Sequence, residues 1–158
     1  MVEMNKRMEE FKKLSALFKE HGFIFLLVGG TVRDFLLTNS VDDMDVVTDA
    51  TPDDMKLFIP DAFSKMGSVR YKSNEIKFDI TTLREEKNYK DSRHPMEVKF
   101  VKDPKIDVFR RDFTINALYM NEHFQVLDYV NGVEDLNKKV IKMIGNPNKR
   151  LQEDPLRI

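Results

Sequence analysis

Hydrophobic residues recur every three or four positions along residues 3–20, where they lie among lysines and glutamates. This period predicts an amphipathic helix with one face against a core. The next segment, residues 23–28, is entirely apolar and predicts a buried strand that the pair Gly29 and Gly30 ends. Thr31 has the side chain of an N-cap, so we expect a short helix directly after this strand.

Alternating apolar and polar residues predict strands further along the chain. The clearest case is residues 69–83, where two alternating stretches flank a polar turn at residues 73–75 and predict a hairpin. Thr51 followed by Pro52 is typical of a helix start. Weaker patterns predict strands over residues 44–47, 115–120, 125–129 and 140–143, a helix into residue 111, a helix over 134–138 and a final helix from residue 148.

The tract over residues 84–105 has no comparable pattern. It is polar, contains Pro95 and Pro104, and shows little periodicity beyond a short apolar stretch at 98–101. Long polar connections of this kind are usually functional, so we interpret the tract as a long loop.

Composition limits the class of protein. A chain of 158 residues that is 41% hydrophobic can bury one core, and a formal charge of -1 means that any contact with RNA must be local. The absence of cysteine excludes disulfides, thiolate ligands and a cysteine nucleophile, and favours a reducing, cytoplasmic setting. The longest apolar run, residues 23–28, is far shorter than the roughly 20 residues that a bilayer requires, and no signal peptide is visible.

Two carboxylates in one strand are the first candidate for chemistry. Asp43 and Asp45 are one residue apart, so on a strand both side chains project from one face. Such a pair can hold two magnesium ions roughly 3.5–4 Å apart, as in phosphoryl transfer. A solvated acidic turn has the same sequence, and this alternative stays open. An EF-hand calcium loop is rejected, because Thr48 stands where that loop needs glycine and Asp54 where it needs glutamate.

The glycine pair is the second candidate. A strand, a glycine turn and a helix start over residues 27–34 would let backbone N–H groups approach an anion, and Arg33 would add positive charge. The spacing is not that of a dinucleotide fingerprint. A plain strand-to-helix turn remains possible, but the acidic pair follows ten residues after Arg33. A phosphate cradle beside a metal pair favours phosphoryl transfer.

A third carboxylate lies on the predicted return strand of the hairpin. Asp79 shares one face of that strand with Lys77 and Thr81. It could complete a catalytic triad of carboxylates. The alternative is a solvent-facing residue paired with Lys77 or Arg84.

Charged residues near the end of the chain suit a nucleotide. Arg110 and Arg111 have planar forks that bind triphosphate oxygens in bidentate fashion, and Asp112 follows them, although ordinary surface charges remain an alternative.

Asp154 and Arg157 are neighbours on a helix. A fixed carboxylate and guanidinium would pair with the amino group and ring nitrogen that C and A share, whereas an intrahelical salt bridge is the simpler interpretation.

Six motifs in one order then carry a family resemblance. LVGGTVRDFLL, DDMDVVTDATPDDM, FDITTLR, RRDFTINAL, DYVNGVEDL and EDPLRI together resemble the class II tRNA nucleotidyltransferases, the CCA-adding enzymes, and the related bacterial poly(A) polymerases. The resemblance spans residues 23–158. It implies an α+β fold, a polymerase-β-like head with a mixed sheet flanked by helices over residues 1–146, and the start of a helical neck over 147–158.

The resemblance also implies roles for single residues. Asp43 and Asp45 match the pair that binds two Mg²⁺ ions, with Asp79 as a third catalytic candidate, and residues 89–95 resemble a flexible loop that helps to switch specificity toward A. The positions that match nucleotide contacts are Gly29, Gly30, Arg33, Arg111, Asp112, Asp154 and Arg157. The implied substrates are CTP, ATP and the 3′ end of a tRNA.

One departure from the family bears on activity. The family continues beyond the L-R-I motif, whereas this chain stops at Ile158. We therefore expect an excised head with the start of the neck, or a truncated natural product, and in either case weak or absent CCA addition by the chain alone. An A-adding enzyme or a poly(A) polymerase is the nearest alternative. A noncatalytic nucleotide- or RNA-binding module and a metal-dependent glycosyltransferase are alternatives from other classes.

Overall fold

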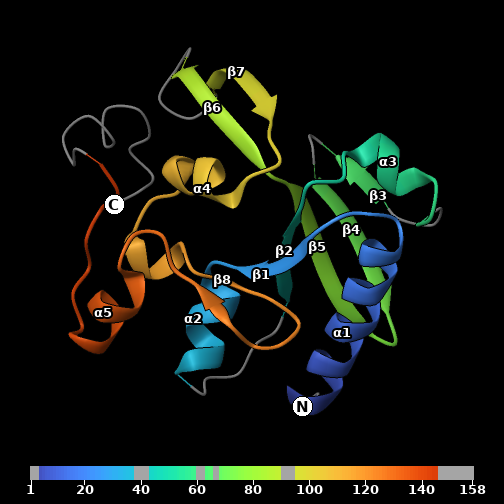
Figure 1. The fold of residues 1–158 in the computed structure, drawn as a ribbon, viewed down its shortest axis with the longest axis horizontal. Helices are drawn as coiled ribbons and strands as arrows, with labels where there is room; N and C mark the ends of the chain where they lie inside the picture. The colour runs from blue at the N-terminus through green and yellow to red at the C-terminus, as the bar shows by residue number, and fades with distance from the viewer. Residues whose placement is uncertain (1–3, 38–42, 60–62, 66–67, 90–94, 146–158) are drawn as a thin grey trace.

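A computed structural model describes residues 4–37, 43–59, 63–65, 68–89 and 95–145 of the chain (Figure 1). The helices are α1 (Met4–Glu20), α2 (Gly30–Leu36), α3 (Pro52–Lys56), α4 (Pro104–Asp107) and α5 (Gly132–Asn137), with 3-10 turns η1 (Val108–Arg110) and η2 (Thr114–Asn116). The strands are β1 (Phe25–Val28), β2 (Met44–Thr48), β3 (Phe63–Lys65), β4 (Ser68–Ser73), β5 (Ile76–Thr82), β6 (Arg84–Tyr89), β7 (Pro95–Phe100), β8 (Tyr119–Met120) and β9 (Val126–Leu127). The chain is thus α+β, as predicted.

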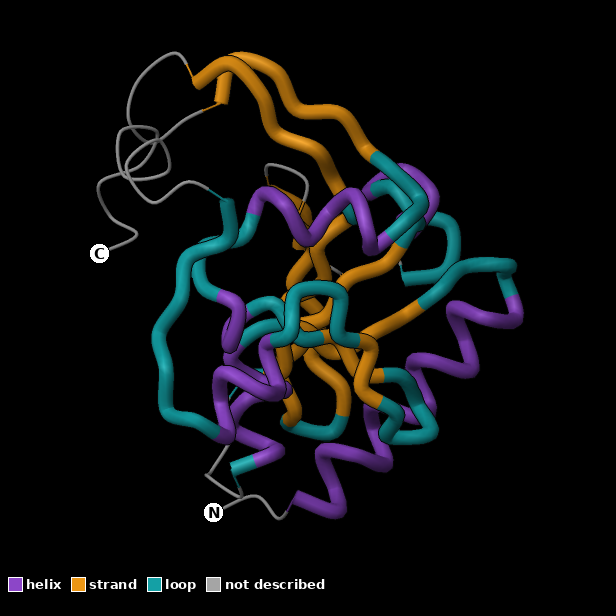
Figure 2. The backbone as a smooth tube through the Cα atoms, turned by 60° about the vertical axis from the view of Figure 1, so that its left-hand side comes forward, coloured by secondary structure: helices purple, strands orange, loops and turns teal. Residues whose placement is uncertain are grey.

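Seven strands form one mixed sheet. Their order is β3-β4-β5-β2-β1-β8-β9, and β2 and β5 pair in parallel while the other neighbours are antiparallel. The parallel register places Asp45 opposite Asp79. Strands β6 and β7 form a separate two-stranded ribbon that extends away from the sheet (Figure 2).

Helices cover one face of the sheet, and the larger of the two hydrophobic cores lies between these helices and the sheet. The predicted amphipathic helix is confirmed as α1, and its apolar stripe packs against the alternate, inward-facing residues of β2 and β5. The residues that α1 buries are Met8, Phe11, Leu14 and Phe18. Helix α3 joins this core through Met55, and a capping box between Thr51 and Asp54 fixes its start, as the sequence predicts.

The opposite face of the sheet carries a smaller core. Its members come from β1, β2 and the segment after β7, and include Val47, Val108 and Tyr119. No long helix covers this face among the described residues, so the space between β2, β5 and the α4–η1–η2 segment is open to a ligand.

Four local predictions are wrong in whole or in part. The predicted strand over residues 115–120 is a strand only at β8, because Thr114–Asn116 form the 3-10 turn η2. Gly29, not Thr31, is the N-cap of α2, and the Thr31 hydroxyl instead bonds to the strand that carries Asp45. The tract over 84–105 is largely the β6–β7 ribbon and not a loop. Because this ribbon extends from the core, its sequence needs no apolar alternation, and Val98 and Phe100 are exposed. The tract over 140–143 makes only an isolated bridge, through Met143.

The glycine at the start of α5 predicts a large effect of one methyl group on stability. A Cβ at Gly132 would overlap the backbone carbonyl oxygen of Thr114 and lie 2.9 Å from the Leu118 side chain. We expect Gly132→Ala to lower the free energy of unfolding by about 3 kcal/mol, because the clash involves backbone that cannot move freely. Urea unfolding measures this. Glu134→Ala is the control, since it removes only an exposed ion pair with Lys138 and should cost less than about 0.5 kcal/mol. Equal stability of the two variants would contradict the packing at Gly132.

Among the helices that the structure describes, none is long and apolar enough to cross a bilayer.

Candidate active site

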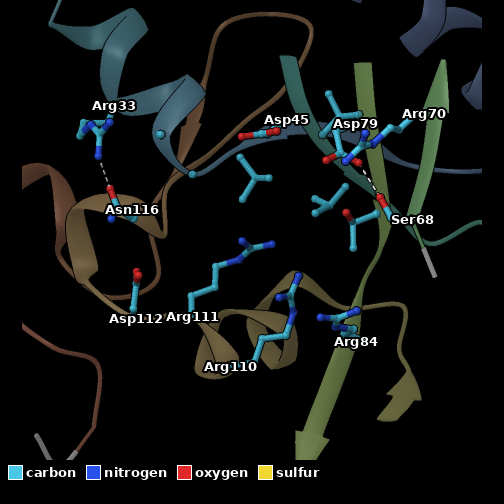
Figure 3. A pocket seen from close by; sticks show the side chains of 16 residues that line it. Arg33, Asp45, Ser68, Arg70, Asp79, Arg84, Arg110, Arg111, Asp112 and Asn116 are labelled. Atoms are coloured by element: carbon cyan, nitrogen blue, oxygen red, sulfur yellow. Dashed lines mark hydrogen bonds between the residues drawn. The ribbon is translucent and has the colours of Figure 1, made fainter. Parts of the chain in front are cut away.

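A cavity of about 940 Å³ lies on the sheet face opposite α1 (Figure 3). It is bounded by β1, β2, β4 and β5 on one side and by the start of β6 and the η1–η2 segment on the other. Its charged and polar lining comes from residues far apart in the sequence. These residues are Arg33, Asp45, Ser68, Arg70, Asp79, Thr81, Arg84, Arg110, Arg111, Asp112 and Asn116.

Two carboxylates meet in this cavity because β2 and β5 are parallel and in register. Asp45 and Asp79 are direct cross-strand partners on the face that bears the cavity, and Ser68 Oγ donates a hydrogen bond to Asp79. Asp43 is exposed just before β2 and does not line the cavity. Burial raises the pKa of Asp45, and the negative charges of Asp79 and Asp43 raise it further, while Arg111 opposes them. A bound cation would relieve this repulsion.

The donor set fits a magnesium ion that shares its ligands with a substrate. Carboxylate oxygens are the ligands Mg²⁺ prefers, and one or two of them usually bind it together with substrate phosphates. Within the described ranges, no three acidic or histidine side chains gather closely enough to hold a metal ion alone. Asp45 and Asp79 would therefore share the ion with water and with the oxygen atoms of a phosphate-bearing ligand.

Thr31 links the glycine turn to β2, the strand that carries Asp45. Its hydroxyl accepts a hydrogen bond from the Asp45 backbone N–H at 3.0 Å and donates to the Asp43 carbonyl oxygen at 3.3 Å. Thr31 is buried, and both of these hydrogen bonds are partly buried. This contact fixes where β2 begins relative to α2.

We expect Thr31→Val to lower the free energy of unfolding by about 1–3 kcal/mol, because it keeps the shape but leaves two backbone groups unpaired. Thr31→Ser keeps the hydroxyl and should recover most of the loss. Urea titrations of both variants measure the difference. If valine and serine give the same stability, the hydroxyl has no structural role.

The glycine turn forms the wall of the cavity beside β1. Gly29 has a positive φ of 70°, which disfavours other residues, and both Gly29 and Gly30 line the cavity. Arg33, one turn into α2, donates from Nη1 to Asn116 Oδ1 at 2.6 Å, and its Nε lies 3.1 Å from Asp34. The arginine is thus held at the cavity wall from two sides.

A buried carboxylate holds the paired arginines. Asp107 has no exposed side-chain surface, yet it lies between two guanidinium groups that both line the cavity. Its oxygens accept hydrogen bonds from Arg110 Nε at 2.8 Å, Arg111 Nη2 at 3.0 Å, the Tyr119 hydroxyl at 2.6 Å and the Arg84 backbone N–H at 2.9 Å. Every arginine contact is charge-assisted, so the two forks are fixed before any ligand binds.

The charges of this network account for the pKa values within it. Burial alone would raise the pKa of Asp107, but Arg111 and Arg110 outweigh it and hold the pKa at about 2. Burial and the neighbouring Arg111 lower the pKa of Arg110. One carboxylate therefore serves two arginines, and Arg110 Nη1 also lies 4.0 Å from Glu86.

Most of the predicted site residues meet in this one place. The cavity brings together Gly29, Gly30, Arg33, Asp45, Asp79, Arg111 and Asp112. Asp154 and Arg157 lie outside the described residues, as does most of the predicted specificity loop, of which only the ends belong to β6 and β7.

Sequence reasoning missed two parts of the site. Asp107 lies three and four residues before the paired arginines, a spacing that could have indicated a contact on one helical turn. Ser68 and Arg70 also line the cavity, and no local signal distinguishes them from an ordinary strand.

Comparison with known proteins places the chain in a family. The model of the poly A polymerase head domain matches residues 25–142. Among curated relatives, the CCA-adding enzyme of Staphylococcus haemolyticus is 39% identical over 93% of this chain and 38% of the relative. The CCA-adding enzyme of Lactobacillus helveticus is 41% identical over 100% of this chain and 41% of the relative. The chain thus spans about two fifths of the length of these relatives.

Solved structures agree with this assignment. The Bacillus stearothermophilus CCA-adding enzyme in complex with CTP superposes with a TM-score of 0.82 at 32% identity, over 95% of this chain and 36% of that one. The Thermotoga maritima CCA-adding enzyme complexed with tRNA_CCA gives a TM-score of 0.72 at 26% identity, over 99% and 36%. The chain belongs to the poly A polymerase head domain family.

Proposed function

We propose that the protein adds C and A to the 3′ end of tRNA, using CTP and ATP, and that this chain supplies the catalytic site. One observation carries the proposal: Asp45, Asp79, a glycine turn and five arginines line one cavity. The arginines are Arg33, Arg70, Arg84, Arg110 and Arg111. Relatives that share about two fifths of their length with this chain are named CCA-adding enzymes, which supports the same activity here.

The triphosphate would lie between the glycine turn and the paired arginines. Gly29 and Gly30 present backbone without side chains, so phosphate oxygens can approach closely. Arg110 and Arg111, held by Asp107, would neutralise the negative charge that phosphoryl transfer places on the leaving pyrophosphate. Because Asp107 fixes both forks beforehand, little reorganisation is needed during the reaction.

Asp45 and Asp79 are the residues that would hold Mg²⁺. Asp43 lies near enough to Asp45 for its negative charge to raise the pKa of Asp45. When bound, Mg²⁺ neutralises phosphate charge and increases the acidity of a coordinated hydroxyl. The protein's contribution is position, because the parallel register places both carboxylates on the floor of the cavity. Asp112, at the cavity edge beyond Arg111, is our candidate for the ribose.

Asp154 and Arg157 are our candidates for base selection. They lie outside the described residues, so the argument is chemical. C and A both present an amino donor beside a ring-nitrogen acceptor, which a carboxylate and a guanidinium match. U and G present the reverse pattern, so both contacts would leave polar groups unpaired.

Nucleotide addition to a tRNA that lacks CCA tests the proposal. The protein carrying this chain is incubated with that tRNA and Mg²⁺, with labelled CTP alone, ATP alone, and both. We expect C from CTP alone, and both C and A when the two are supplied together. Incorporation of A alone onto this tRNA would favour an A-adding enzyme or a poly(A) polymerase. No incorporation of either nucleotide would favour a noncatalytic binding module.

A further inference from the structure

The cavity has a second positively charged side that the nucleotide contacts above do not use. Across the sheet, the order of strands places Arg70 on β4, Asp79 on β5, Asp45 on β2 and the glycine turn after β1. Neighbouring strands are about 4.8 Å apart, so three strand spacings, about 14 Å, separate β4 from β1. In Figure 3, Arg33 lies to one side of Asp45, whereas Arg70 lies beside Asp79 on the other side.

The geometry of phosphoryl transfer gives these two sides different partners. The attacking oxygen and the leaving oxygen lie roughly in line, on opposite sides of the phosphorus. If the pyrophosphate lies at the glycine turn and Arg33, the attacking 3′-hydroxyl must come from the side of β5 and β4. The RNA strand that ends in this hydroxyl then brings its last phosphodiester toward Arg70.

Arg70 is suited to bind that phosphodiester. Its side chain is exposed at the cavity, and the part of the chain that the structure describes offers it no ion pair. Its cross-strand neighbour, Asp79, accepts a hydrogen bond from Ser68. Arg84, the other cation on this side, differs, because its Nε lies 2.6 Å from Glu86. Arg70 is therefore the stronger candidate for an external anion.

We propose that Arg70 binds the terminal phosphodiester of the acceptor RNA, so that β4 forms the acceptor side of the site. This inference rests on the proposed function, because it assumes transfer to an RNA 3′ end. It assigns the acceptor a contact within the head itself.

Binding of acceptor RNA by the protein carrying this chain tests the inference. We expect Arg70→Ala to raise the Kd for a tRNA lacking CCA about ten-fold, and Arg70→Lys to raise it less, because one charge-assisted contact is lost or weakened. The slope of log Kd against log salt should decrease by about 0.7, as for one single-strand phosphate contact. The KM for CTP should stay within about two-fold.

Lys72→Ala is the matched control. Lys72 lies two residues further along β4, is exposed and shares the strand face of Arg70, but does not line the cavity. Its removal should leave the Kd and the salt slope unchanged. Thermal melting of all variants separates binding effects from unfolding.

An acceptor with a neutral methylphosphonate at its last linkage identifies the phosphate. With this acceptor, wild type and Arg70→Ala should bind equally within about two-fold, because the charge that Arg70 contacts is gone. An unchanged Kd for Arg70→Ala, an equal ten-fold loss with both acceptors, or a raised KM for CTP would each overturn the inference. A wild-type protein that binds tRNA but adds no nucleotide would overturn the proposed function and this inference with it.

Discussion

Replacing Asp45 with asparagine is expected to lower the kcat of nucleotide addition by about 10³-fold or more. Asp45 lines the cavity, and asparagine keeps its shape while removing the charge that would hold Mg²⁺. The measurement is single-turnover addition of C to a tRNA lacking CCA, at saturating Mg²⁺ and CTP.

The same substitution should not destabilise the fold. The pKa of Asp45 is raised by burial and by the charges of Asp79 and Asp43, so its ionised form is less favourable in the folded protein than in the unfolded chain. We expect the melting temperature of Asp45→Asn without metal to equal or exceed that of wild type. Asp53→Asn is the control, because Asp53 is exposed on α3 and does not line the cavity. Activity of Asp45→Asn within ten-fold of wild type would contradict the catalytic role of the Asp45 carboxylate.

Asp107→Asn is expected to lower the free energy of unfolding by about 3–4 kcal/mol at pH 7, because it leaves Arg110 and Arg111 in place without their shared counter-charge. It should also raise the KM for CTP at least about ten-fold, since the two forks lose the group that fixes them. Urea unfolding and steady-state kinetics measure the two effects. Asp107→Glu, which keeps the charge, should recover part of both.

The effect of Asp107 depends on pH in a defined direction. Its pKa is about 2 in the folded protein against an ordinary value of 3.8, so its carboxylate contributes about 2 kcal/mol that is fully present above pH 4 or so. This contribution is lost as pH falls from about 4 toward 2. The stability difference between wild type and Asp107→Asn should therefore shrink over that range. Asp103→Asn, on the exposed N-cap of α4, should change stability by less than about 0.5 kcal/mol at every pH. A difference that stays constant down to pH 2 would contradict the role of the carboxylate.

Local periodicity explains what could be predicted from the sequence. The helix over residues 4–20 and the hairpin around residues 73–75 follow from the spacing of apolar residues, which reports the face that each element buries. The same alternation correctly put Asp79 on the face opposite the core. Its pairing with Asp45 did not follow, because the parallel register of β2 and β5 is a contact between segments more than 30 residues apart.

Features that depend on tertiary packing escaped prediction. The β6–β7 ribbon has a polar sequence that resembles a loop, and its apolar residues Val98 and Phe100 are exposed. Asp107 looks like a surface charge, and only the fold shows that it is buried beneath two arginines and Tyr119. Thr31 has the chemistry of an N-cap, but the strand beside it uses the hydroxyl instead. In each case, a neighbour distant in sequence decides the role of the residue.

A crystal structure of the protein carrying this chain, with CTP and Mg²⁺ bound, tests the central claim most directly. The account predicts a triphosphate between the turn at Gly29 and Gly30 and the guanidinium of Arg111, with Mg²⁺ between its oxygens and Asp45. It also predicts the cytosine edge against Asp154 and Arg157. A CTP bound away from Asp45, or a triphosphate that leaves the glycine turn and the arginines without a contact, would contradict it.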